Sequence, residues 1–222
     1  MNWVSILGSI SIWIILVPLL IGVASYSKLN YDSKLILSIV LIGTLPQVLR
    51  PFINNSSSLT LLYNLYTPSE FIVYYFLFIK KVSLPYFKNI FVTTAVFFLL
   101  ASLFFIFKQG LLNRFINEWV IINNIFQIIW ICLCLMEYYK TEDSVIETNQ
   151  PFFWFLIGIT AYSTCTVVFY SLWYFIKSDS GSQTQILKII HHIFNIALYV
   201  FFSIGLFKNY TLKHLNNYNN FG

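Results

Sequence analysis

The N-terminal stretch of the chain reads WVSILGSISIWIILVPLLIGVASY over residues 3–26 and contains no charged side chain. A bilayer core about 30 Å thick is crossed by roughly 20 apolar residues in an α-helix, because the helix rises 1.5 Å per residue. The stretch is long enough for this, and it is longer than the apolar part of a signal peptide. We therefore expect it to be a retained transmembrane helix.

Six further apolar stretches of similar length follow along the chain. The seven expected spans cover residues 3–26, 35–53, 59–79, 88–107, 115–139, 151–176 and 184–207. The connectors between them are short, so we expect no extramembrane domain. The sequence thus predicts a single domain, residues 1–222, folded as an all-α polytopic transmembrane bundle of seven helices.

The composition agrees with a membrane protein. Of the 222 residues, 58% are hydrophobic and only 9% are charged, and the mean hydropathy is +0.74. Soluble domains have about 25% charged residues, so this chain lacks the polar side chains to cover a water-facing surface. Disordered chains, disulfide scaffolds and nucleic-acid modules are excluded on the same grounds. We expect a multi-pass protein of a bacterial cell (inner) membrane, with the lipid bilayer as its first partner.

Basic residues predict the orientation, because short loops rich in Lys and Arg stay in the cytoplasm. One set of span ends carries eight basic residues: Lys28, Lys34, Lys80, Lys81, Lys88, Lys140, Lys208 and Lys213. The other set carries four: Arg50, Lys108, Arg114 and Lys177. We therefore expect the N-terminus outside and the C-terminus in the cytoplasm.

Polar side chains inside a span are informative because burying them in lipid is costly. Glu70 is the clearest, roughly 16 Å from the outer end of the third span at 1.5 Å per residue. Helical spacing places Tyr63, Tyr66, Thr67 and Tyr74 on the same stripe as Glu70. The carboxyl group is therefore expected to have hydroxyl neighbours.

Two other spans carry polar stripes that reach a similar depth. In the seventh span the stripe comprises Lys188, His192, Asn195 and Tyr199, and in the fifth span it comprises Asn117, Asn124 and Gln127. By helical rise, Asn195 lies about 17 Å deep and Gln127 about 18 Å deep.

From these stripes we predict a polar pocket open to the outside. Its candidate ligand-binding or ion-pathway residues are Tyr66, Glu70, Tyr74, Asn124, Gln127, Lys188, His192 and Asn195. Glu70 is either neutral or paired with His192. The alternative is that these side chains only hold helices together through hydrogen bonds, as polar groups in membrane bundles often do.

The sequence indicates no catalytic residue, no metal site and no cofactor. The membrane histidines, His191 and His192, diverge by about 100° on a helix, and no Cys-x-x-Cys spacing occurs. A non-enzymatic sensory or accessory signalling component with a small-molecule ligand fits best, and an acidic loop with Glu142, Asp143 and Glu147 could meet a cytoplasmic signalling protein. A small-solute or ion-coupled transporter is the first alternative and a membrane-embedded enzyme the second.

Three short motifs carry a resemblance. They are Asn64-Leu65-Tyr66-Thr67-Pro68-Ser69-Glu70-Phe71, Pro151-Phe152-Phe153-Trp154, and Ile190-His191-His192-Ile193-Phe194-Asn195-Ile196. With the span layout, they resemble small bacterial seven-span membrane proteins, a group that implies no activity. In that group a Trp often precedes the His by a few positions, where this chain has Leu187 and Lys188.

Overall fold

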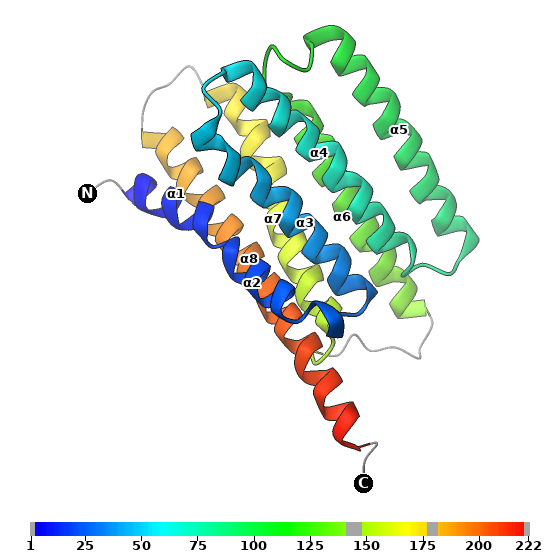
Figure 1. Ribbon diagram of the computed structural model, residues 1–222. Helices are drawn as coiled ribbons and strands as arrows, with labels where there is room; N and C mark the ends of the chain where they lie inside the picture. Colours follow the sequence, from blue (N-terminus) through cyan, green and yellow to red (C-terminus); the bar gives the residue numbers. More distant parts are fainter. Residues whose placement is uncertain (1–2, 141–147, 177–181, 220–222) are drawn as a thin grey trace.

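The computed structural model describes residues 3–140, 148–176 and 182–219 (Figure 1). Within these ranges the chain is helical with short connectors and contains no strand. The α-helices are α1 (Trp3–Trp13), α2 (Leu16–Ala24), α3 (Tyr31–Leu49), α4 (Ser56–Ile79), α5 (Pro85–Gln109), α6 (Asn117–Lys140), α7 (Pro151–Ile176) and α8 (Ser182–Asn219), and two 3-10 turns cover Tyr26–Lys28 and Arg50–Phe52. The predicted all-α class is confirmed. The acidic loop with Glu142, Asp143 and Glu147 lies outside the described residues.

Six helical segments of the described chain are long and apolar enough to cross a membrane, counting α1 and α2 as one. The remaining helix, α4, has 24 residues but is more polar, because its first half carries several Ser, Thr, Tyr and Asn side chains. These properties indicate a multi-pass integral membrane protein.

Proline explains the break between α1 and α2. Pro18 has no N–H to donate to the carbonyl of Ile14, and its ring crowds that carbonyl. The chain turns at Ile14 and Ile15, and the N–H of Val17 bonds Ile14 instead, at 3.0 Å. Pro46 and Pro68 lie inside α3 and α4.

Polar caps set two other helix starts. The side chain of Asn30 accepts the N–H of Ser33 at 2.9 Å at the start of α3. Asn55 does the same for Ser57 at 3.0 Å at the start of α4. Such caps satisfy N–H groups that have no partner within the helix.

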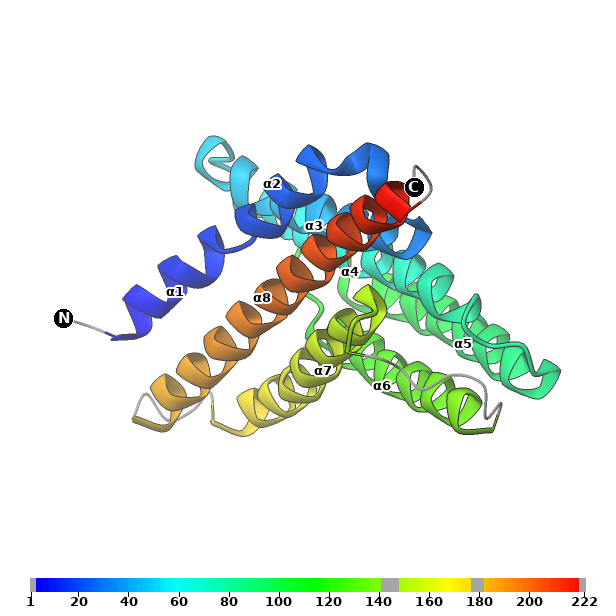
Figure 2. The same ribbon diagram turned by 90° about the horizontal axis from the view of Figure 1, so that it is seen from below.

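Helices α2, α3, α4, α6, α7 and α8 pack in that order as a closed ring, with α1 and α2 both against α8 (Figure 2). Helix α5 packs outside the ring against α4 and α6. We predicted that the third, fifth and seventh spans present their polar faces to one another. Helices α4 and α6 pack directly against each other, whereas α7 stands between α6 and α8, so the polar face of α8 meets those of α4 and α6 across the interior of the ring.

The two ends of the bundle differ. The N-terminus lies at one end and the C-terminus at the other (Figure 1). In the half nearer the C-terminus, apolar side chains fill the ring, including Val40, Leu77, Phe78, Cys134 and Phe155, all fully buried. Helix α8, predicted to end at residue 207, continues to Asn219 and projects past the other helices. A few buried polar side chains, among them Ser33, Glu137 and Asn209, also lie in this half, but most of them lie in the opposite half.

Candidate ligand site

A cavity of about 310 Å³ lies in the half of the bundle nearer the N-terminus. Its wall comes from α1, α3, α4, α6, α7 and α8, together with Arg50 and the connector between α5 and α6. Polar and aromatic side chains dominate this wall, in contrast with the apolar packing of the other half. The cavity is therefore the natural place for a hydrophilic ligand within the span region.

Glu70 forms part of the cavity wall and is only 5% exposed. The hydroxyl of Tyr66 donates to Glu70 Oε1 at 2.8 Å, and the Asn123 amide donates to Oε2 at 2.8 Å. Tyr63 and Thr67 line the cavity beside them, as the spacing along α4 predicts. Helix α4 thus presents a carboxyl group held by a neighbour on its own helix and by α6.

Helix α8 contributes His192, Asn195 and Tyr199 to the opposite wall. Ser11 of α1 holds two of them: its hydroxyl and His192 Nδ1 are 3.0 Å apart, and its carbonyl accepts the Asn195 amide at 3.2 Å. His192 is therefore bonded to Ser11, not to Glu70. Glu70 and His192 nevertheless face the same cavity, as the pocket hypothesis requires.

Asn124 and Gln127 of α6 have different positions. Asn124 lines the cavity, and its Nδ2 donates to the carbonyl of Val120 at 2.7 Å. Gln127 is 1% exposed and does not line the cavity. Its Oε1 accepts the hydroxyl of Ser163 at 2.7 Å, so Gln127 joins α6 to α7.

Two further candidates also lie away from the cavity. Tyr74 is 1% exposed and packs against Phe78 below Glu70, with ring centroids 6.1 Å apart. The ammonium of Lys188 lies 5.3 Å from the ring centre of Trp173, near the start of α8. A lysine near a helix end commonly directs its charge away from the lipid in this way.

Sequence reasoning missed part of the wall. Helix α7 supplies Tyr162 and Tyr170, α8 supplies His191, and α3 supplies Gln47 beside Pro46. The ring of His191 stacks on Phe169 at 4.5 Å between centroids, and it lies 6.3 Å from that of His192. The two histidines diverge along the helix, yet both reach one cavity. The eight-residue spacing of Tyr162 and Tyr170 was the available signal.

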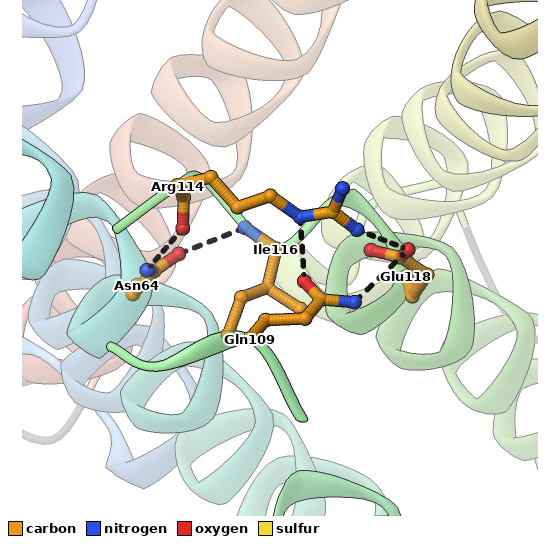
Figure 3. A network of polar contacts seen from close by, with 5 residues as sticks. All are labelled: Asn64, Gln109, Arg114, Ile116 and Glu118. Carbon is orange, nitrogen blue, oxygen red and sulfur yellow. Dashed lines mark hydrogen bonds and ion pairs between the residues drawn. The ribbon is translucent and has the colours of Figure 1, made fainter. Parts of the chain in front are cut away.

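The connector between α5 and α6 contributes Phe115 to the cavity wall. It is held by Asn64 of α4 (Figure 3). Asn64 Nδ2 donates to the carbonyls of Leu111 and Arg114 at 2.8 and 2.9 Å, and Asn64 Oδ1 accepts the N–H of Ile116 at 3.0 Å. These bonds position Phe115, which lines the cavity and meets the ring of Tyr63 edge to face.

A second set of bonds surrounds this connector. Arg114 pairs with Glu118 at 3.0 Å and donates to Gln109 Oε1 at 2.9 Å, while Gln109 Nε2 donates to Glu118 at 3.2 Å (Figure 3). Both ends of the connector are therefore tied to each other and to α4.

The wall offers acids, bases, amides and hydroxyls, which suit reversible binding. Within the described ranges, no three His, Cys, Asp or Glu side chains gather in a way that could hold a metal ion. No protein-family model, curated protein or solved structure matches the chain.

Proposed function

We propose that the chain is a seven-span protein of a bacterial cell membrane that binds a small polar molecule from outside the cell and acts as a non-enzymatic sensory or accessory signalling component. The observation that carries this proposal is a polar cavity at one end of a bundle whose other half is closed by apolar packing. A ligand can enter such a cavity from one side only.

The lysines support the proposed orientation. Lys28, Lys34, Lys81 and Lys140 lie at the helix ends away from the cavity. Lys208 lies there too, because its ammonium is 5.7 Å from the ring centre of Trp154 at the start of α7. Because basic loops stay in the cytoplasm, the cavity then faces outward. A reporter fused after Gly222 tests this: activity in the cytoplasm agrees with the proposal, and activity only outside the cell contradicts it.

Helix α8 supports a signalling role. It carries His192, Asn195 and Tyr199 in the cavity wall, and without a break it reaches Asn219 beyond the opposite end of the bundle. A ligand that binds two arrangements of α8 unequally shifts the balance between them. The projecting end of α8 would present that shift to a cytoplasmic protein.

Transport is the second candidate, because a buried carboxylate and proline-containing or broken helices are usual parts of transporters. Removal of residues 213–222 separates the two functions, since it leaves the cavity and the described helix contacts in place. The readout is the expression of the genes that respond to deletion of the gene for this protein. We would compare it in the deletion strain complemented with wild type, Glu70→Gln or this shortened chain. A sensory role predicts that both variants behave like the deletion strain. Transport predicts that the shortened chain complements fully and that only Glu70→Gln fails.

A further inference from the structure

Glu70 is a buried acid that has no basic partner in the part of the chain that the structure describes. Its two oxygens accept hydrogen bonds from Tyr66 and Asn123, which are both neutral. The ion pairs seen among the described residues are Lys81–Asp32 and Arg114–Glu118, and neither includes Glu70. A carboxylate buried in a membrane bundle is costly unless a positive charge compensates it. The cavity beside Glu70 is where such a charge can enter.

Two residues of the cavity wall, Asn124 and His191, each have a buried hydrogen-bonding atom that has no partner among the described residues. Asn124 uses its Nδ2 on the Val120 carbonyl, which fixes the orientation of the amide. Its Oδ1 is then buried without a partner among the described residues, and so is Nδ1 of His191, which accepts when the ring proton is on Nε2. Together with Glu70, these atoms call for a ligand that carries both positive charge and N–H donors.

Aromatic rings complete the surroundings. Tyr63, Tyr66, Tyr162, Tyr170 and Tyr199 all line the cavity. The faces of such rings attract cations within about 6 Å of the ring centre. The same chemistry already occurs in this chain, since the ammonium of Lys80 lies 3.3 Å from the ring centre of Tyr31.

The basic side chains of the wall are not paired with Glu70, so the positive charge beside it can come from a ligand. Arg50 lines the same cavity but is exposed at the end of α3, and His192 is bonded to Ser11. The volume of about 310 Å³ corresponds to about ten water molecules at 30 Å³ each. The ligand or ligand group is therefore small.

We propose that the cavity binds a protonated primary amine, whose ammonium group lies against Glu70 and Asn124 inside the ring of tyrosines. This inference rests on the proposed function, because it names the ligand class of the same cavity. The ammonium belongs either to a small free amine or to an aminoalcohol headgroup of a lipid.

Calorimetric titration of the full chain in phosphatidylcholine nanodiscs tests the proposal with ethylammonium chloride as the probe. We expect saturable binding of ethylammonium, with tetramethylammonium, which has the charge but no N–H, and ethanol both at least tenfold weaker. Equal binding of tetramethylammonium, or no binding of ethylammonium, would overturn the proposal.

Variants locate the site. Glu70→Gln should weaken ethylammonium binding at least tenfold, because it removes the charge and keeps the size of the side chain. Glu70→Asp should retain part of the affinity, which shows that a loss in Glu70→Gln is not a loss of folding. Asp32→Asn, at the opposite end of the bundle, should bind like wild type. Equal affinity of wild type and Glu70→Gln would contradict the assignment.

Nanodiscs of phosphatidylethanolamine distinguish the two sources of the ammonium. If the lipid headgroup occupies the cavity, these nanodiscs should abolish ethylammonium binding to the wild type. If the ligand is a free amine, binding should be the same in both lipids. Either result supports the amine site.

The amine site and the proposed function can fail separately. If the wild type does not bind ethylammonium but Glu70→Gln abolishes the cellular response, the amine site is rejected and the sensory function is kept. If ethylammonium binds and Glu70→Gln weakens that binding, but Glu70→Gln still complements the deletion strain fully, the amine site is kept and the sensory function is rejected.

Discussion

Replacement of Asn64 by Ala should destabilise the protein more than any change on its exposed surface. The side chain of Asn64 is 1% exposed and makes three hydrogen bonds to the backbone of the connector between α5 and α6. Each such bond contributes about 0.5–1.5 kcal/mol to the free energy of unfolding. One of them satisfies the N–H of Ile116, a residue with no exposure, and a buried N–H left without a partner costs about 1–3 kcal/mol. We expect a total loss of about 2–4 kcal/mol.

The assay is equilibrium unfolding of the purified chain in mixed detergent micelles, followed by far-ultraviolet circular dichroism. Asn113→Ala is the matched control, because Asn113 is exposed in the same connector and makes one local bond, to the carbonyl of Gln109. It should change the free energy of unfolding by less than about 0.5 kcal/mol. Asn64→Asp keeps the acceptor for Ile116 and should fall between the two. If Asn64→Ala is as stable as Asn113→Ala, the connector is not held as described.

Two changes in the packed part of the bundle should also lower the free energy of unfolding in the same assay. Gly205→Ala places a methyl group against the buried ring of Phe155 where α7 meets α8, so we expect a loss of about 1–3 kcal/mol. Gly8→Ala is the control, because its methyl group comes no closer than 3.4 Å to the described atoms around it and should be neutral. Equal stability of the two variants would contradict this packing. Thr94→Val removes the hydroxyl that accepts the indole N–H of Trp130 at 2.9 Å and should cost about 1–3 kcal/mol. A Thr94→Ser variant that is no more stable than Thr94→Val would show that the hydroxyl does not matter.

Much of the fold follows from the length of the apolar stretches, because the bilayer allows few alternatives to a helix of about 20 residues. Apart from the C-terminal end of α8, the predicted spans lie within a few residues of the observed helices. The length of α8 was not foreseen. Spans are found from runs of apolar residues, so the predicted span ends where these residues end. The helix itself continues into the polar residues that follow.

The candidate site was predictable along each helix but not between helices. Spacing placed Tyr66 with Glu70, and the structure brings both together with Asn124, His192 and Asn195 around the cavity. Spacing does not give the order of helices in the ring, so the contribution of α7 was missed. It also leaves the floor of the cavity undefined. Whether Gln127 and Tyr74 lie in the wall or below it depends on how closely the helices pack.

The most direct test of the outward-facing cavity is modification of Glu70→Cys in a chain whose native Cys132, Cys134 and Cys165 are replaced by Ala. A membrane-impermeant cationic methanethiosulfonate would be added either to intact cells or to inside-out vesicles. The proposed orientation predicts modification in intact cells and little in inside-out vesicles, because residue 70 lines the cavity and the opposite half of the described bundle is mostly apolar and packed. Modification from the cytoplasmic side alone, or from neither side, would contradict an outward-facing cavity at Glu70.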